Sequence, residues 1–137
     1  MIPYVSLTDM QGPIPGPFLS EALDDGDSIT PAQVWNSIAC AVGKEIDGVL
    51  GSRYSVPFSN PIPAVISRAA FVLAAEMLYL RRGKTENPFT TQAVAVREQL
   101  RKIGDGEQLL APVIQRPQPV AILEPAGSAS SRNKISL

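Results

Sequence analysis

The chain has 137 residues and a formal net charge of −1 at neutral pH, with 12 basic and 13 acidic side chains. This length allows one domain with a modest core, and the near-zero charge gives no overall attraction to nucleic acid or anionic membranes. There is no histidine and only one cysteine, Cys40, so the commonest general base and metal ligand is missing and one chain cannot form a disulfide. The first ten residues lack the basic and apolar regions of a signal peptide, and we therefore expect a cytoplasm-like compartment.

The N-terminal segment, residues 1–29, is rich in proline and in acidic side chains. Four prolines between residues 3 and 17 forbid a long helix, so we predict only short helical turns, at about residues 6–10 and 18–23. The sequence Asp-Asp-Gly-Asp follows at residues 24–27. It matches a calcium loop poorly, because neither possible frame has glycine at the sixth position and glutamate at the twelfth, and we interpret it as an acidic turn.

Residues 30–110 are predicted to form a helical bundle core, beginning with a helix from residue 31 to about residue 51. Thr30 suits the N-cap of this helix and Pro31 suits its first turn. Apolar residues recur at helical spacing: Val34, Trp35, Ile38, Ala39, Val42, Ile46, Val49 and Leu50. Cys40 is expected to be a small buried side chain. The residues expected to face solvent are Lys44, Glu45 and Asp47.

The longest apolar run, residues 63–82, predicts a central helix that packs against other elements on most of its sides. It ends with Arg81 and Arg82, where cations interact favourably with the helix dipole. Arg68 and Glu76 lie inside the run. Because both charges are costly in a bilayer, we expect a central helix of a bundle rather than a membrane span.

A third helix is predicted from Pro88 or Thr90 to about Ile103, and residues 52–62 are predicted to be an extended, proline-rich connection. The apolar positions of this helix are Phe89, Ala93, Val94, Val96, Leu100 and Ile103. Its other face carries charged residues: Arg97, Glu98, Arg101 and Lys102. We expect an ordinary solvated face with helical ion pairs rather than a phosphate-binding patch.

Residues 111–137 are predicted to form an extended, proline-containing C-terminal arm. Four prolines between residues 112 and 125 exclude a helix there, whereas the apolar side chains between them would be costly to leave in water. Such a segment suits strand addition to a partner or a groove on one, and an unstructured tail is the alternative. The predicted partner-binding residues are Val113, Ile114, Arg116, Val120, Ile122, Leu123, Ile135 and Leu137.

The sequence shows no pattern of catalytic residues. It has no glycine-rich phosphate loop, no nucleophile elbow and no cysteine–histidine pair. We therefore predict no catalytic residues, no cofactor and no metal site, and we expect that the protein is not an enzyme.

One stretch resembles a known family. Residues 45–57, Glu-Ile-Asp-Gly-Val-Leu-Gly-Ser-Arg-Tyr-Ser-Val-Pro, are followed by Pro63, a long apolar helix and the sequence Leu-Arg-Arg-Gly at residues 80–83. This order, with an acidic turn before the first long helix, is similar to the small Mu-type phage and prophage proteins regarded as head–tail adaptors. The resemblance covers about residues 20–110.

Together these patterns predict an all-α fold: a small bundle of three long helices plus short N-terminal helical turns, with an extended C-terminal arm. The resemblance further implies a structural role, as a homo-oligomeric ring, typically a dodecamer, beneath the portal protein of a DNA-filled head. The arms would reach the portal, and neck or tail proteins would dock below. It also implies that Arg53, Tyr54 and Pro57 fix the corner between helix and loop, and that DNA passes through the lumen without base reading. The expected location is the neck of the virion, with assembly in the host cytoplasm and no membrane partner.

Two other functions stay open at this point. One is a small helical protein–protein adaptor or regulatory module of bacterial or prophage origin, which would bind another protein through its apolar faces. The other is a DNA-binding helical protein, which would need a basic recognition helix and salt-dependent binding. The near-neutral charge argues against the second.

Overall fold

Five helices make up the described part of the chain, which contains no strand. The computed structural model describes residues 3–26, 28–110 and 113–115. The helices are α1 (Leu7–Met10), α2 (Gly16–Ala22), α3 (Pro31–Leu50), α4 (Ala64–Leu80) and α5 (Thr90–Gly104). The predicted all-α class, with three long helices and short N-terminal ones, is therefore confirmed. Most of the predicted arm lies outside the described residues.

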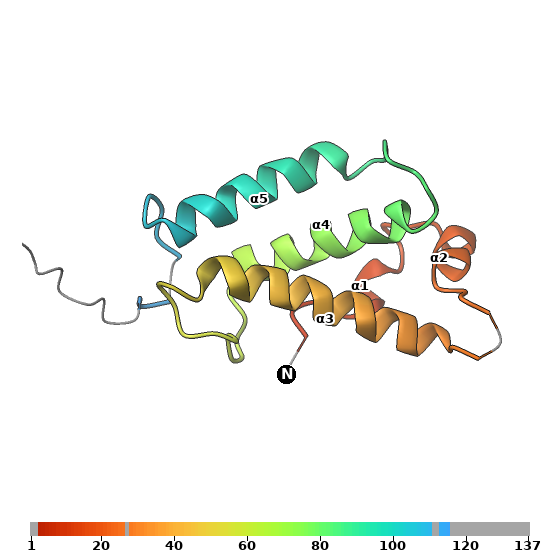
Figure 1. Ribbon diagram of the computed structural model, residues 1–137, viewed down its shortest axis with the longest axis horizontal. Helices are drawn as coiled ribbons and strands as arrows, with labels where there is room; N and C mark the ends of the chain where they lie inside the picture. Colours follow the sequence, from red (N-terminus) through yellow and green to blue (C-terminus); the bar gives the residue numbers. More distant parts are fainter. Residues whose placement is uncertain (1–2, 27, 111–112, 116–137) are drawn as a thin grey trace, which may run out of the picture.

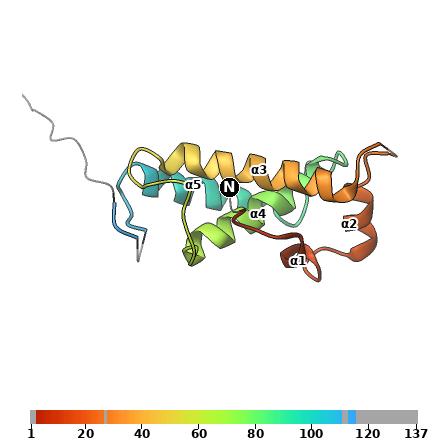
Figure 2. The ribbon, with the colours of Figure 1, turned by 90° about the horizontal axis from the view of Figure 1, so that it is seen from below.

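The three long helices lie side by side along the long axis of the molecule (Figure 1). Each packs against the other two, and α1 and α2 pack against α4. Successive long helices run in opposite directions, so the C-termini of α3 and α5 meet the N-terminus of α4 (Figures 1 and 2). We call this the corner end, comprising residues 51–63, 105–110 and 113–115. The opposite end, comprising residues 21–26 and 81–89, is called the α2 end.

The start of α3 is fixed by a capping box at the predicted position. The Thr30 hydroxyl accepts a hydrogen bond from the Gln33 backbone N–H at 3.2 Å, and the Gln33 side chain accepts one from the Thr30 N–H at 2.8 Å. Both N–H groups belong to the first turn of the helix, where no helical carbonyl is available to them. The predicted cap and the Pro31 start are confirmed.

Two side chains of α3 differ from the prediction. Cys40 is exposed rather than buried, because it lies two residues from both Ile38 and Val42, about 200° around the helix from each. Val49 is 38% exposed, although its spacing places it within the apolar stripe; it lies in the last turn of α3, where the end of α5 approaches its backbone. The rest of the predicted stripe is buried.

The central position of α4 explains its largely apolar sequence. It contacts α1, α2, α3 and α5, and nine of its 17 residues are buried. Pro63 is the N-cap rather than the first helical residue, since the helix begins at Ala64. Arg68 is exposed. No helix in the described part of the chain is long and apolar enough to cross a membrane.

The N-terminal segment packs into the same core as the long helices. Tyr4, Met10, Ile14 and Leu19 are all buried members of the single hydrophobic cluster. The ring of Phe18 in α2 stacks on Tyr79 in α4, with a centroid separation of 4.4 Å. The described residues therefore share one core, and α2 covers the C-terminal half of α4.

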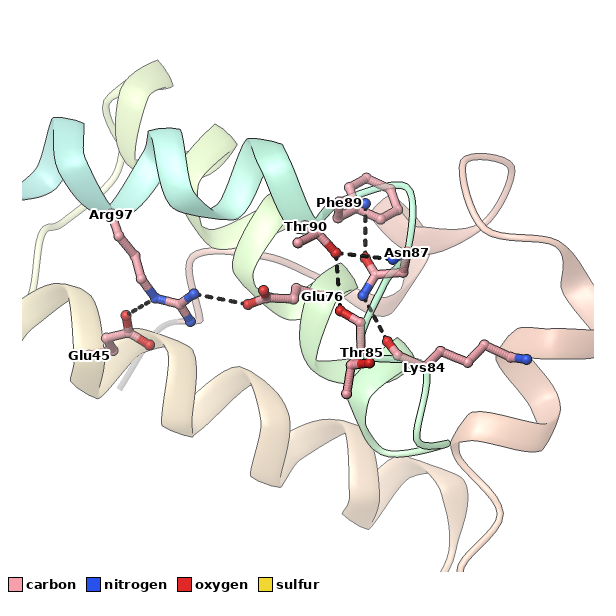
Figure 3. A network of polar contacts seen from close by, with 8 residues as sticks. All are labelled: Glu45, Glu76, Lys84, Thr85, Asn87, Phe89, Thr90 and Arg97. Atoms are coloured by element: carbon pink, nitrogen blue, oxygen red, sulfur yellow. Dashed lines mark hydrogen bonds and ion pairs between the residues drawn. The ribbon is translucent and has the colours of Figure 1, made fainter.

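The loop before α5 is shaped by Asn87 and Thr90 (Figure 3). The Asn87 side chain accepts a hydrogen bond from the Phe89 N–H at 2.9 Å and donates one to the Lys84 carbonyl at 3.0 Å. The Thr90 hydroxyl accepts from the Asn87 N–H at 3.0 Å. Short polar side chains that bond the local backbone in this way favour turns over continued helix, so α5 begins at Thr90, one of the two predicted starts.

The apolar face of α5 is narrower than predicted. Ala93, Val96, Leu100 and Ile103 are buried against α3 and α4. Val94 was predicted on the same face but is 66% exposed. It follows Ala93 by one residue, a rotation of about 100° that turns its side chain to solvent.

Candidate functional site

The corner end joins chain segments that are far apart in the sequence (Figure 1). Three of its hydrogen bonds connect residues more than 50 positions apart. It contains the predicted corner residues Arg53, Tyr54 and Pro57, together with residues 113–115, the described part of the predicted arm.

Tyr54 is the buried centre of this end. Its side chain is 0% exposed, and its hydroxyl accepts a hydrogen bond from the Leu110 N–H at 3.0 Å. Its own N–H donates to the Leu50 carbonyl at 2.9 Å, which extends the last turn of α3. Tyr54 therefore holds the chain that leaves α5 against the chain that leaves α3.

Arg53 and two glycines bring the end of α5 onto α3. The Arg53 Nε donates to the Gly104 carbonyl at 3.2 Å, a favourable place for a cation because helix C-termini carry partial negative charge. A Cβ on Gly104 would lie 2.5 Å from the Val49 carbonyl oxygen, so only glycine allows this approach. Gly106 has a φ of +84°, and a Cβ there would lie 2.6 Å from the Arg53 guanidinium carbon.

Tyr4 ties the N-terminal segment to the connection between α3 and α4. Its hydroxyl donates to Asp47 Oδ1 at 2.6 Å and accepts from the Phe58 N–H at 2.8 Å. Burial, and next the hydrogen bond to the Asp47 carboxylate, raise the pKa of the Tyr4 phenol well above its usual value. Asp47 was expected to face solvent and is instead half-buried in this contact. Sequence reasoning missed Tyr4, because nothing local to residues 1–29 shows that it reaches Phe58.

Apolar side chains face outward beside this buried framework. Leu109 is 71% exposed and Ile114 is 88% exposed. Next to them is an open hollow of about 370 Å³, lined by Pro57, Phe58, Asn60 and Pro61 of the connection and by Val113. Among the described residues, none that lines this hollow carries a charge, and most are apolar. A hollow with a mainly apolar lining suits docking of an uncharged segment.

The predicted arm residues fall into two groups. Val113 is half-buried against the core of its own chain, and its N–H donates to the Leu110 carbonyl at 2.8 Å. Ile114 projects into solvent. The others lie outside the described residues: Arg116, Val120, Ile122, Leu123, Ile135 and Leu137.

An arginine on α5 links the three long helices in the middle of the bundle (Figure 3). Arg97 donates from Nε to Glu45 of α3 at 2.9 Å and from Nη1 to Glu76 of α4 at 3.0 Å. These carboxylates raise the pKa of the guanidinium, chiefly through the hydrogen bond to Glu45. Arg97 and Glu45 were both predicted to face solvent. Arg97 is exposed, as predicted, and Glu45 is half-buried. The ion pairs between helices were not predicted, because the partners lie on different helices.

The rest of the charged face of α5 is an ion-pair cluster, as predicted. Arg101 bonds Glu98 at 2.7 Å, Asp105 at 2.7 Å and Glu107 at 3.1 Å. The Arg101 guanidinium lowers the pKa of the Glu98 carboxyl through their hydrogen bond. Because the arginines at 97 and 101 are already bonded to carboxylates, this face offers little free positive charge to a phosphate backbone.

The α2 end is held by two arginines that follow α4. The Arg81 side chain bonds the Asp25 carboxylate and donates to the Ala22 carbonyl at 3.0 Å. Arg82 donates to the Asp24 carbonyl at 2.7 Å and to the Glu21 carbonyl. The acidic turn and the two arginines thus form one unit, which explains why both occur in the chain. In the described residues, no group of three acidic or cysteine side chains could hold a metal ion.

The chain was compared with families, curated proteins and solved structures. Residues 4–121 match the family model described as "Bacteriophage Mu, Gp36". No curated protein and no solved structure matches the chain. The matched residues include all five helices and both ends of the bundle.

Proposed function

Because the chain belongs to the Bacteriophage Mu Gp36 family, and is therefore a Mu-like phage protein, we propose that it is a structural head–tail connector. In this proposal it forms a homo-oligomeric ring, a dodecamer, beneath the portal protein of the DNA-filled head. It links the head to neck or tail proteins and does not act as an enzyme. DNA crosses the lumen of the ring without sequence-specific contacts.

The observation that carries the proposal is the corner end. It presents Leu109 and Ile114 to solvent, next to the described start of the predicted arm, residues 113–115. Apolar groups held outward on a fixed framework are typical of surfaces that a partner covers. The framework is fixed because Tyr54 binds Leu110, only three residues before Val113. We therefore place the portal contact at this end.

Binding to purified, DNA-filled heads that carry a portal tests the proposal. The full chain is compared with a variant ending at Gln115, which keeps Val113 and its packing against the core. A second pair, Ile114→Asp and Val94→Asp, places the same charge on two exposed apolar positions, one at the corner end and one on the outer face of α5.

The full chain should bind stoichiometrically and only at the portal vertex, and the variant ending at Gln115 should not bind. Ile114→Asp should weaken binding by at least about tenfold, the effect of losing one apolar anchor, whereas Val94→Asp should leave it near the original level. If the full chain binds no portal-bearing head of its own phage, the connector function is wrong. If Val94→Asp weakened binding and Ile114→Asp did not, the portal contact would lie on α5 instead of at the corner end.

A further inference from the structure

The hollow at the corner end is already formed in the single chain, and the proposed portal contact through Leu109 and Ile114 does not fill it. It is about 370 Å³ in volume and is lined mainly by the connection between α3 and α4, with Val113 at its rim. Its wall is fixed from two directions, because Phe58 is hydrogen-bonded to Tyr4 and Tyr54 to Leu110. Because the wall is already fixed, less conformational entropy is lost when a segment binds in the hollow.

We propose that this hollow binds residues 117–123 of a second copy of the same chain. The inference rests on the ring of the proposed function and names the contact that joins neighbouring subunits. Residues 117–123 have the sequence Pro-Gln-Pro-Val-Ala-Ile-Leu, which contains no charge, and they are flanked by Arg116 and Glu124. An uncharged, largely apolar segment between two charges matches a hollow whose described lining is mainly apolar and carries no charge.

The length of the chain fits a neighbouring copy. Val120 lies seven positions after Val113, which lines the hollow, and an extended chain over seven residue steps spans about 22–25 Å. Two helices side by side are about 20–24 Å wide, so this reach is about one bundle width. Pro117 and Pro119 favour extended backbone, and an extended segment would lead away from its own hollow toward that of a neighbour.

The position of the hollow also suits a closed ring. The hollow and the start of the C-terminal segment lie at the same end of the bundle. A rotation about one axis can therefore place the segment of each copy on the hollow of the next copy at the same level, the geometry that closes a ring. Ile135 and Leu137 lie farther along the chain and remain available to the portal.

Disulfide trapping between two full-length variants tests the inference. Both variants carry Cys40→Ser, which removes the exposed native cysteine. One also carries Asn60→Cys, at the hollow, and the other carries Ile122→Cys. Each chain then has a single cysteine, so a mixed disulfide forms only when the segment of one copy reaches the hollow of another. In the control pair, the exposed Thr91→Cys on the far end of α5 replaces Asn60→Cys.

The two variants are mixed in solution and on portal-bearing heads, and the mixed disulfide is measured in each. Its yield should exceed that of the control pair by at least about tenfold, because docking raises the effective concentration of the two thiols. Adding Val120→Asp to the second variant should return the yield to the control level. Equal yields for both pairs, in solution and on heads, would overturn the inference.

Head binding in the same samples separates the two proposals. Binding without enrichment of the mixed disulfide leaves the connector function standing and removes the subunit contact. Enrichment of the mixed disulfide without head binding supports the subunit contact and removes the connector function, because the chain would then assemble through its own segment without a portal.

Discussion

The two ends of the bundle are both held together by contacts between residues far apart in the sequence, but by different chemistry. At the corner end, the buried hydroxyls of Tyr54 and Tyr4 bond backbone N–H groups. At the α2 end, the partly exposed guanidiniums of Arg81 and Arg82 bond backbone carbonyls and a carboxylate.

This difference predicts different behaviour. Hydrogen bonds to buried phenols are shielded from water and salt, and a missing partner leaves a buried polar group unsatisfied. Contacts of partly exposed guanidiniums are screened by salt and are individually weak. The corner end should therefore be a rigid platform, and the α2 end a contact that responds to ionic strength. A rigid platform is the property that a docking surface needs.

The largest expected effect is at Tyr54. Tyr54→Ala removes a fully buried ring and should lower the free energy of unfolding by about 3–5 kcal/mol, the usual cost of deleting a buried aromatic side chain. Tyr54→Phe keeps the ring but leaves the Leu110 N–H without an acceptor, and should cost about 1–2 kcal/mol. Urea denaturation of both variants checks this order. Equal costs would mean that the ring contributes nothing beyond its hydroxyl.

The next effect is at the contact between α3 and α5. Gly104→Ala should destabilise by about 1–3 kcal/mol, since its Cβ would lie 2.5 Å from the Val49 carbonyl and the helices must separate. Gly48→Ala is the matched control, because nothing lies within 4 Å of its Cβ position. That change should stabilise α3 by about 0.5–1 kcal/mol. Thermal unfolding of the two variants should shift in opposite directions; a stable Gly104→Ala variant would contradict the close approach.

Tyr4 gives the corner end a dependence on alkaline pH. Its phenol has a raised pKa in the folded chain, so its contribution to stability is fully present below the unfolded pKa of about 10 and is lost as the pH rises further. Tyr4→Phe should cost about 1–2 kcal/mol at pH 7. The difference between the two proteins should shrink above about pH 10. A difference in unfolding free energy that stays constant from pH 7 to pH 11 would show that the Tyr4 phenol is not perturbed by folding.

The smallest effect is expected at the α2 end. Arg81→Gln removes the ion pair with Asp25, and because both side chains are about a third exposed, the cost should be about 0.5–1 kcal/mol at low salt. The cost should decrease as the salt concentration rises to 1 M, whereas that of Tyr54→Phe should not. Unfolding of both variants at two salt concentrations checks the contrast. If the stability cost of Arg81→Gln did not depend on salt, the α2 end would not differ from the corner end in its response to ionic strength.

Local signals in the sequence predicted the helices well. Thr30 and Pro31 marked the start of α3, and the longest apolar run marked α4 as the central helix. The errors concern the rotation of helices about their axes. Val94 and Cys40 point outward, although both lie in apolar stretches, because the side that a helix buries depends on its neighbours. The spacing of apolar residues gives that rotation only approximately, so residues beside a stripe are easily assigned to the wrong side.

The contacts of the candidate site were harder to predict, for the same reason. Arg53 and Tyr54 could be assigned to the corner from the resemblance, but their partners, Gly104 and Leu110, depend on how α5 returns to α3. The position of Arg81 and Arg82 at the end of a helix predicted only an interaction with the helix dipole. Their contacts with the acidic turn require the packing of α2 on α4, which no local pattern encodes.

Cryo-electron microscopy of portal-bearing heads incubated with the full chain tests the central claim most directly. The connector function predicts a closed ring of density beneath the portal, one copy of the bundle in each repeat, with the corner end facing the portal and Ile114 within contact distance of it. A portal vertex without added density, or the bundle bound elsewhere on the head, would contradict it.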